Sequence, residues 1–447
     1  MTVTPLQPQI WPTTAKVNGN GALEIGGFDV RDLARDFGTP LMVLDQADVL
    51  QRLREFKEAF TFPDLEVKLH YASKAFSSAE FLRWVSAEGF GVDVATGGEL
   101  GLALAAGVPA SDLVFHGSNK SIGELTRAVG AGVSAIVIDS FDEIDRLARI
   151  VADAARPVDV LLRLTLGVEA HTHEFISTAH EDQKFGLSVA SGAAEQAVLA
   201  IEQVPNLRLR GLHSHVGSQM FDPAGFDLAA ARAMDFAAHL LRTHRIEVEE
   251  LDLGGGLGIA YVEGDDPLPV VDMARALREI INAESRRLDL PKPTLSIEPG
   301  RAIVGTSTVT VYEVGTIKPV ALDGGGQRLY VSVDGGMSDN IRTALYGAEY
   351  TARIAGRSTI GTPVQSRVVG KHCESGDIVV RDLELPSDIR PGDLLAVAAT
   401  GAYHRSMASN YNLVTRPPVV AVKDGVSRVL IRRETEADLF RLDEGLA

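Results

Sequence analysis

The sequence predicts an α/β protein in which a (β/α)8 barrel is joined to a mostly β domain. From about residue 46 to residue 300, short apolar runs alternate with amphipathic stretches. Eight such alternations in about 250 residues match the usual size of a (β/α)8 barrel. After Arg301 long helical patterns become rare, and strand-like runs separated by turns replace them.

The apolar runs are the predicted barrel strands. In chain order they are Val67–Tyr71, Gly91–Val94, Leu113–Phe115, Ala135–Ile138, Val158–Leu164, Leu209–Ser214, Leu251–Leu253 and Leu295–Glu298. A doubly wound open sheet is the alternative. It more often has fewer strands, and it places its glycine loop after the first strand.

Between these runs, apolar residues recur at helical spacing. The predicted helices are Ser78–Glu88, Glu99–Ala106, Gly123–Val129, Asp142–Ala155, Ala193–Gln203, Phe226–Thr243 and Met273–Arg287. Gly89, Gly107 and Gly132 stand where three of these helices should end, because glycine tolerates the left-handed conformation that closes a helix.

The segments outside the barrel predict an all-β domain. Its expected strands are Thr306–Val314, Leu329–Val333, Val364–Val369, Asp377–Val380, Leu394–Ala398 and Pro418–Val422. The opening run Pro40–Leu44 is expected to add strands, and the charged tail from Glu434 to end as a short helix. We therefore expect residues 46–304 to form the barrel, and residues 1–45 and 305–447 the β-domain.

Composition excludes several classes of protein. The net charge of −17 argues against a nucleic acid or an anionic membrane surface as partner. No basic segment followed by an apolar stretch opens the chain, and no run of ~18 apolar residues predicts a membrane span. The single cysteine, Cys373, rules out an intrachain disulfide and fits a reducing compartment. We expect a cytoplasmic protein.

Polar or glycine-rich motifs follow most of the predicted barrel strands, at the end where barrel enzymes carry their chemistry. Lys74 follows the first strand, beside Tyr71 and small residues. An amine shielded in this way can act as a nucleophile, although a lone lysine is more often a solvated loop residue. The later strand ends carry Asp93, His116–Lys120, His213–Gln219, Gly254–Gly258 and Glu298–Arg301.

The last two strand ends favour an anion site. Gly254–Gly256 exposes backbone amides, and Gly300 and Arg301 follow the neighbouring strand, so we favour phosphate over a tightly packed turn. A dinucleotide site is excluded because the loop follows the seventh strand rather than the first. Glu298 ends an apolar strand and needs a partner. A pyridinium N–H would serve, and an internal arginine is the other possibility.

Histidines raise the question of a metal. His215 could be a satisfied barrel residue, a metal ligand together with His213, or a flat ring against a cofactor. No acidic or cysteine residue flanks the pair at metal-ligand spacing, so we expect no metal. The long polar stretch 167–184 holds three more histidines and favours a solvated lid or specificity loop over a metal site. These are His171, His173 and His180.

A reactive lysine, a phosphate loop and a ring-nitrogen acid together indicate pyridoxal phosphate bound to a barrel. From about Phe37 to the C-terminus the chain resembles the diaminopimelate decarboxylase family, and the motifs come in the family's order. They are Tyr71–Ala75, His213–Ser218, Gly254–Gly256, Glu298–Arg301, Asp334–Met337, Cys373–Asp377 and Gly401–Tyr403. One departure is His404-Arg405, where smaller or aromatic residues are common in relatives.

The resemblance implies roles for individual residues. Lys74 would form the Schiff base, His215 would stack on the ring and Glu298 would pair with its nitrogen. Asp93 and Tyr403 would also contact the cofactor. The phosphate and the adjoining region would be surrounded by Ser218, Gly254, Gly255, Gly256, Gly300 and Arg301. The substrate contacts would come from Arg301, Arg342, Tyr346, Glu374 and Tyr403. Cys373 would be the proton donor.

The resemblance also implies a reaction and a partner. The reaction is the decarboxylation of meso-2,6-diaminopimelate to L-lysine and carbon dioxide, the last step of lysine biosynthesis. Arg301 and Arg342 can grip a far carboxylate while Glu374 takes an ammonium, which favours this substrate. In the family Cys373 and Glu374 reach the site of the other subunit, so a homodimer with shared active sites is implied.

Three alternatives stay open. The first is a decarboxylase of ornithine, arginine or carboxynorspermidine on the same fold. The second is a pyridoxal phosphate carrier without turnover, against which the large β-domain with Cys373 and Tyr403 argues. The third is an amino-acid racemase, which would favour a weaker ring-nitrogen partner than Glu298.

Overall fold

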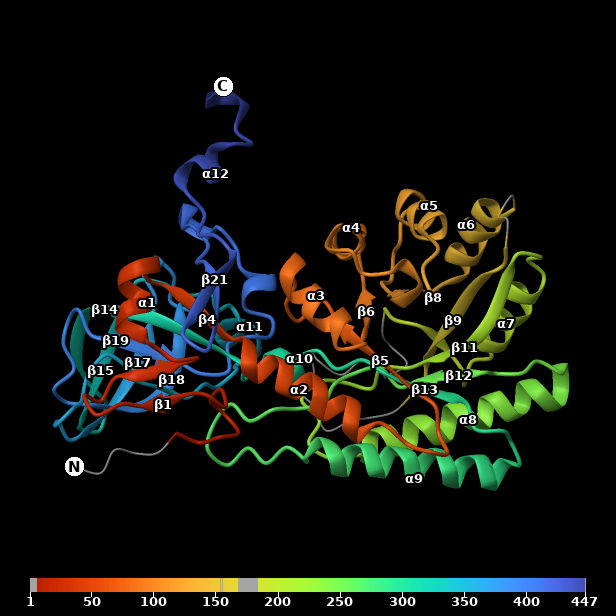
Figure 1. Ribbon diagram of the computed structural model, residues 1–447, viewed down its shortest axis with the longest axis horizontal. Helices are drawn as coiled ribbons and strands as arrows, with labels where there is room; N and C mark the ends of the chain where they lie inside the picture. Colours follow the sequence, from red (N-terminus) through yellow and green to blue (C-terminus); the bar gives the residue numbers. More distant parts are fainter. Residues whose placement is uncertain (1–5, 153, 155, 168–183, 447) are drawn as a thin grey trace. The chain divides into compact units, whose positions relative to one another are not determined.

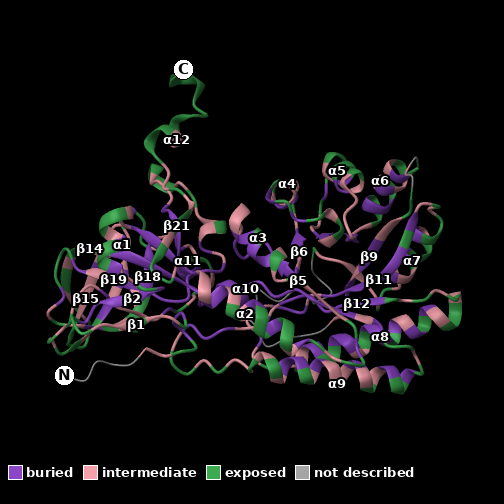
Figure 2. Ribbon diagram, viewed as in Figure 1, coloured by how far each residue is buried: buried purple, intermediate pink, exposed green. Residues whose placement is uncertain are grey.

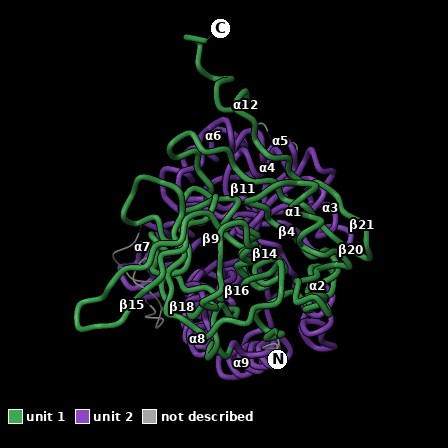
Figure 3. The backbone as a smooth tube through the Cα atoms, turned by 90° about the vertical axis from the view of Figure 1, so that its left-hand side faces the viewer, with its two compact units in different colours: residues 1–52, 259–266, 301–447 green, residues 53–258, 267–300 purple. Residues whose placement is uncertain are grey.

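The computed structural model describes residues 6–152, 154, 156–167 and 184–446. The chain divides into two compact units, coloured separately in Figure 3. The barrel unit comprises residues 53–258 and 267–300, and the β-unit comprises residues 1–52, 259–266 and 301–447. None of the helices in the described ranges combines the length and the apolar character that crossing a membrane requires.

The barrel unit is a closed ring of eight parallel strands. Figure 1 labels strands of this unit and the helices that accompany them. The pairing β13–β5 closes the ring, with Leu295 opposite Val67. β10 (Leu187–Ser188) adds to β9 in parallel. The ring consists of β5 (Val67–Ala72), β6 (Gly91–Val94), β7 (Leu113–Phe115), β8 (Ala135–Ile138), β9 (Val158–Thr165), β11 (Leu207–His213), β12 (Glu250–Asp252) and β13 (Thr294–Ile297). The predicted barrel is confirmed.

Helices follow the barrel strands as predicted. They are α3 (Ala79–Ala87), α4 (Gly97–Ala106), α5 (Ile122–Ala131), α6 (Phe141–Val151), α7 (Ala193–Glu202), α8 (Ala224–His244) and α9 (Val270–Leu288). The first four begin at hydroxyl side chains that accept a first-turn amide, which satisfies a donor that the helix cannot. These N-caps are Ser78, Thr96, Ser121 and Ser140. Gly107 and Gly132 close α4 and α5 in the left-handed conformation, as expected.

The long helices bury one side only. The buried residues of α9 include five whose spacing of three to four residues aligns them along one stripe: Met273, Leu277, Ile281, Ser285 and Leu288. Buried and exposed residues accordingly alternate along this helix (Figure 2).

The β-unit is built around one long strand, β14 (Thr308–Ala321). Its first part pairs with both β4 (Leu41–Asp45) and β19 (Leu394–Val397), and its second part pairs with β15 (Gln327–Val333). The strand β4 confirms that the opening segment contributes to this sheet. The remaining strands are β16 (Ala352–Ile354), β17 (Pro363–Val369), β18 (Ile378–Pro386), β20 (Val419–Lys423) and β21 (Val426–Ile431).

Short elements complete the β-unit. A three-stranded sheet forms from β1 (Lys16–Val17), β2 (Leu23–Ile25) and β3 (Phe28–Asp29). The α-helices of this unit are α1 (Val30–Phe37), α10 (Arg301–Val304), α11 (Arg342–Tyr346) and α12 (Glu436–Phe440). The helix α2 (Gln46–Ala59) contains residues of both units, because the division falls between Arg52 and Leu53. Thr435 and Asp438 form a capping box at α12, so the charged tail does contain the predicted helix.

Candidate active site

A group of titratable side chains lies at the carboxyl ends of the barrel strands. We call it the barrel cluster, and it consists of Lys74, Asp93, His116, His213, His215 and Glu298. Lys74 is exposed in the loop after β5, and Asp93 is buried within β6. His213 ends β11, while His116 and Glu298 directly follow β7 and β13. Because the strands are parallel, all these positions meet at one end of the ring.

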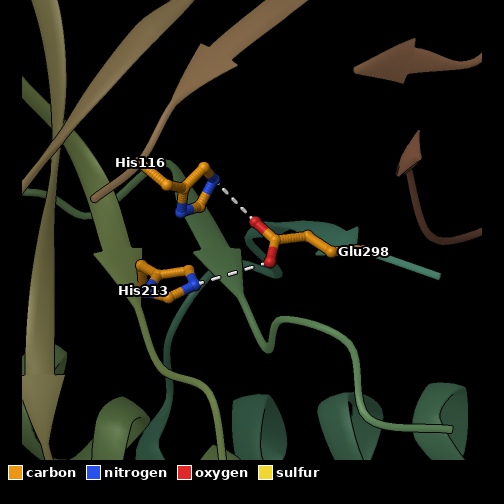
Figure 4. Close-up of side chains that lie close together, drawn as sticks. All are labelled: His116, His213 and Glu298. Atoms are coloured by element: carbon orange, nitrogen blue, oxygen red, sulfur yellow. Dashed lines mark ion pairs between the residues drawn. The ribbon is translucent and has the colours of Figure 1, made fainter. Parts of the chain in front are cut away.

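Glu298 is the centre of this cluster (Figure 4). Its carboxylate is 3% exposed, with Oε1 2.8 Å from Nε2 of His116 and Oε2 3.7 Å from Nε2 of His213. The rings of the two histidines meet edge to face, with centroids 5.0 Å apart. His116 also lies 3.7 Å from Oδ1 of Asp93. Histidines therefore accompany this carboxylate, a pairing that the sequence did not suggest.

The surroundings keep Glu298 ionised. Burial alone would raise the pKa of its carboxyl, but His116 and His213 hold that pKa well below its usual value. Burial raises the pKa of Asp252 well above its normal range, and the charge of Glu298 raises it further. Burial lowers the pKa of His213 to about 4. Of these two neighbouring carboxyls, the surroundings thus favour the charged form of Glu298 over that of Asp252, beside the neutral imidazole of His213.

Lys74 acts electrostatically on two other members of the cluster. Burial raises the pKa of Asp93 to about 6, although the charges of His116 and Lys74 act to lower it. The pKa of His215 is lowered well below its usual value by burial and then by the charge of Lys74. His215 is therefore an uncharged ring close to the lysine amine, as a residue that packs against a flat cofactor should be.

Unused hydrogen-bonding capacity indicates what the site can receive. Within the described residues, Oε1 of Glu298, Nε2 of His116 and both ring nitrogens of His213 have no aligned hydrogen-bond partner, despite the short contacts. Buried polar atoms are normally satisfied, and exceptions mark functional sites. An ionised, buried carboxylate with a free acceptor position fits a ligand that donates an N–H, and a pyridinium ring is such a ligand.

The glycine loop packs tightly on its neighbours. Gly254 donates its amide to Oδ1 of Asp252 at 2.8 Å, and Gly255 donates to Nδ1 of His215 at 3.2 Å. A Cβ at Gly255 would lie 2.2 Å from the carbonyl oxygen of Glu298. Gly254 and Gly256 have φ of +69° and +103°. Close packing therefore requires these glycines whatever ligand the loop binds, and its phosphate role stays a prediction.

Ser218 and Gly300 occupy the neighbouring strand ends. Ser218 is half-buried in the loop that follows β11. Gly300 is buried, and a Cβ there would lie 3.1 Å or less from atoms of Ala72 and Ala75, in the segment that carries Lys74. The loops that follow β5 and β13 thus lie in direct contact.

One motif at a strand end is structural. Lys120 is buried and donates to the carbonyl oxygens of Gly117 and Val137 at 2.7 and 2.6 Å. It also forms a 2.6 Å ion pair with Glu143 on α6. This lysine therefore ties together the ends of β7 and β8, and it does not supply a reactive amine.

The histidines form a different group from the pair considered in the sequence. Among the described residues, His213 converges with His116 and Glu298, and these three could hold a metal ion geometrically. His215 is not part of this group. The expectation that the site holds no metal stays a prediction. His171, His173 and His180 lie outside the described residues.

The β-unit carries a second group of predicted residues, the arginine cluster: Arg301, Arg342, Tyr346 and Tyr403. The guanidinium carbons of Arg301 and Arg342 lie 5.0 and 5.5 Å from the centroid of the Tyr403 ring, and Arg342 lies 5.4 Å from that of Tyr346. Both arginines are buried. The structure brings all four predicted residues together.

Comparisons with known proteins decide the family. Residues 46–305 match the family model described as "Pyridoxal-dependent decarboxylase, pyridoxal binding domain". The chain is 53% identical to diaminopimelate decarboxylase of Mycobacterium tuberculosis, over 98% of each chain. The chain belongs to the diaminopimelate decarboxylase family. The resemblance and the pyridoxal phosphate prediction are confirmed.

Solved structures of the family agree with the fold. Diaminopimelate decarboxylase from M. jannaschii, in complex with L-lysine, is 32% identical and covers 97% of this chain and 98% of its own, with a TM-score of 0.89. A lysine/ornithine decarboxylase from Vibrio vulnificus, complexed with putrescine, is 26% identical with a TM-score of 0.72, covering 88% of this chain and 97% of its own. The same fold therefore serves more than one basic amino-acid decarboxylase.

Two tyrosines of this family member escaped the sequence reasoning. Nε of Arg342 donates to the hydroxyl of Tyr350 at 2.9 Å, and Arg301 donates to the hydroxyl of Tyr261. The two rings meet edge to face, with centroids 5.4 Å apart. Tyr261 lies five residues after the glycine loop, and that proximity to a motif was the available signal.

The departure His404-Arg405 has a structural explanation. Tyr403 has φ of +64°, which is unusual for a residue other than glycine and is often found at functional sites. The His404 ring is buried 5.3 Å from that of Tyr350, and Nδ1 lies 3.0 Å from the carbonyl oxygen of Ala402. Burial and then the charge of Arg342 lower its pKa to about 3. An uncharged His404 thus packs behind the arginine cluster.

Cys373 and Glu374 differ from the other predicted residues. They lie on the turn between β17 and β18, and both are exposed. Glu374 accepts from the hydroxyl of Ser375 and the amide of Gly376, each at 3.3 Å. These side chains are therefore accessible from solvent.

Proposed function

We propose that the chain decarboxylates meso-2,6-diaminopimelate to L-lysine and carbon dioxide with the help of pyridoxal phosphate. The observation that carries this proposal is the ionised, buried carboxylate of Glu298 within a domain of the pyridoxal-binding family. The relatives named diaminopimelate decarboxylase, and the M. jannaschii structure that holds L-lysine, support the choice of substrate and product.

The residues of the barrel cluster suit distinct tasks around the cofactor. The amine of Lys74 would anchor pyridoxal phosphate, and Glu298 would accept the N–H of its ring. The uncharged His215 would pack against the cofactor, and Asp93 would act near the lysine. The phosphate region would be held by Ser218, Gly254, Gly255, Gly256, Gly300 and Arg301. When bound, the cofactor accepts the electron pair that remains after carbon dioxide leaves.

The charge on Glu298 matters because it keeps a proton on the ring nitrogen. A protonated ring is a stronger electron acceptor than a neutral one. Because burial raises the pKa of Asp252 and His213 is neutral, Glu298 is the favoured place for negative charge beside that proton. The neighbours of Glu298 thus set the electronic properties of the site.

The arginine cluster suits the distal end of the substrate. Arg301 and Arg342 can hold a carboxylate by paired hydrogen bonds, and Glu374 can hold an ammonium. Tyr261 and Tyr350 hydrogen-bond the two guanidinium groups and so limit their rotation. Tyr346 and Tyr403 supply the aromatic faces on which Arg342 rests. A substrate with an amino-acid group at each end uses all these contacts, whereas ornithine lacks the far carboxylate.

The last chemical requirement is a proton donor at carbon. We assign this role to the thiol of Cys373, and we place Cys373 and Glu374 in the site of a second subunit. Their exposure on the turn between β17 and β18 makes them available to a partner. The active form is then a homodimer with shared sites, and the proposed boundary between barrel and β-domain lies near residue 304.

The anchoring residue provides the most direct test. The purified protein should produce L-lysine and carbon dioxide from meso-2,6-diaminopimelate. After borohydride reduction, peptide mapping should find a pyridoxyl group on Lys74. The Lys74→Ala variant should lose both the adduct and the activity, whereas Lys120→Ala should keep the adduct on Lys74 if it folds. A pyridoxyl group on any other lysine would contradict the assignment, and an adduct without carbon dioxide release would indicate a carrier or a racemase.

Substrate choice can be tested at Arg342. Arg342→Lys keeps the positive charge but loses the planar fork that binds a carboxylate at two points. We expect kcat/KM for diaminopimelate to fall by about tenfold to a hundredfold, because one charge-assisted hydrogen bond is worth roughly 1.5–3 kcal/mol. Any residual turnover of ornithine should change less. Equal losses for both substrates would contradict the assignment of Arg342 to the distal carboxylate.

A further inference from the structure

Two helices of the barrel unit present a cluster of metal-binding side chains outside the active site. It consists of Glu195 in the first turn of α7, and His239 and His244 in the last two turns of α8. We propose that this cluster, which we call the outer cluster, binds a zinc ion. The proposal goes beyond decarboxylation and departs from our expectation that the protein holds no metal.

The geometry of the outer cluster already converges on one point. Nε2 of His239 lies 2.9 Å from Oε1 of Glu195, and Nε2 of His244 lies 2.6 Å from the same oxygen. The two rings are edge to face, with centroids 6.1 Å apart. One donor atom from each of the three residues lies within 4.8 Å of the other two.

Zinc would require only a small adjustment of these atoms. Bonds of about 2.0–2.2 Å in a tetrahedral arrangement put neighbouring donors roughly 3.3 Å apart. The two contacts to Glu195 would therefore lengthen by less than an ångström. Since all three side chains are long and at least partly accessible, rotation about their side-chain bonds can supply that movement.

The donor chemistry also fits. Two imidazole nitrogens and one carboxylate oxygen are ligands that zinc uses in proteins, and a water can take the fourth position. His239 is 47% exposed at its side chain, so water and metal can reach the group. Nδ1 of the same ring lies 3.4 Å from the hydroxyl of Thr243, a contact of the kind that orients a metal-binding histidine.

The buried group His116, His213 and Glu298 is the other metal-competent set among the described residues. It is enclosed at the barrel end, where Glu298 already has a task in the proposed function. The outer cluster has no such task, and solvent reaches it directly. A metal there would connect the start of α7 to the end of α8 and stabilise the barrel unit against unfolding.

The test is equilibrium dialysis against zinc. The full-length, cofactor-loaded protein is first treated with a chelator to remove bound metal and is then dialysed. We expect one zinc per chain, and an increase of about 2–4 °C in the thermal midpoint at saturation. Cobalt in place of zinc should give the visible absorption of a tetrahedral site. The double variant H239Q/H244Q should bind zinc at least about tenfold more weakly, because even outer-shell losses cost 10–100-fold.

Glutamine keeps an amide that can still hydrogen-bond Glu195, so this variant separates metal binding from loss of the helix contact. A triple variant, H171A/H173A/H180A, controls for the histidines outside the described residues and should keep the zinc. The proposal is overturned if wild type binds no zinc, if H239Q/H244Q binds it as wild type does, or if only the triple variant loses it.

Discussion

At the scale of single residues, the charge state of Glu298 is the property that most directly links structure to reaction. A carboxylate buried in apolar surroundings would normally take up a proton. Here His116 at 2.8 Å and His213 at 3.7 Å reverse that tendency. Neither histidine adjoins Glu298 in sequence, so the barrel must close before this carboxylate acquires its partners.

Replacing this carboxylate by its neutral isostere tests the link. Glu298→Gln should keep the cofactor attached through Lys74, because the anchoring amine is untouched. We expect kcat to fall on the order of 10²–10³, the usual cost of removing one preorganised electrostatic contact. Cofactor content by absorbance, together with the rate of carbon dioxide release, measures the two effects separately.

His116→Asn is the companion variant, because it removes the imidazole at 2.8 Å and leaves Glu298 in place. Its loss of kcat should be smaller than that of Glu298→Gln. If Glu298→Gln turned over substrate at the wild-type rate, the ring-nitrogen role would be wrong.

The residues predicted to contact the substrate lie close together, but the sequence did not reveal their partners. The structure brings together Arg301, Arg342, Tyr346 and Tyr403, whose roles stay a prediction. Tyr350 stands outside every motif, and it meets Arg342 only because α11 ends and the chain turns back. Contacts of that kind depend on tertiary geometry, which local sequence patterns do not encode.

At the scale of elements, buried strands were easier to predict than exposed ones. The eight barrel strands are largely buried, and each was found to within a few residues. The strands β1 and β3 have two residues each, too short for a periodic pattern, and no residue of β21 is fully buried. The strand β14 extends seven residues beyond its predicted end at Val314. The prediction stopped short because the second half of the strand is largely exposed.

The loop between β15 and α11 provides a pH-dependent test of stability. Asp339 is buried there, accepting from the hydroxyl of Tyr312 and from the amide of Gly336 at 2.9 Å. Burial raises the pKa of its carboxyl from 3.8 to about 7. Between these values the folded state binds the extra proton, so stability falls as pH rises through this window and the loss is complete above it.

Asp339→Asn removes this titration while keeping one acceptor and one donor. We expect the variant to be more stable than wild type at pH 8, by up to a few kcal/mol at about 1.4 kcal/mol per pKa unit. The advantage should shrink or vanish at pH 4. Thermal midpoints of both proteins across this range measure the difference. A pH-independent difference would contradict the raised pKa.

At the scale of the whole molecule, the functional residues are divided between the two compact units. The barrel cluster lies in the barrel unit and the arginine cluster in the β-unit, while Cys373 and Glu374 are exposed on the latter. In the proposed function, pyridoxal chemistry and recognition of the distal substrate end thus fall to separate parts of the fold. The proposed exchange of residues between subunits is compatible with that division.

Subunit mixing tests this arrangement. Lys74→Ala and Cys373→Ala should each be nearly inactive. For Cys373→Ala we expect kcat to fall by a factor of about 10²–10⁴, because a general acid contributes that much. In a hybrid dimer with shared sites, one site combines both altered residues and the other has neither. Random exchange of equal amounts should then restore about a quarter of wild-type activity, since half of the twofold-symmetric assemblies are hybrids. Mixing Lys74→Ala with a variant that carries both Lys74→Ala and Cys373→Ala should restore none, because every site then lacks Lys74. If hybrid dimers form, as judged by mass, but stay inactive, Cys373 serves the site of its own subunit.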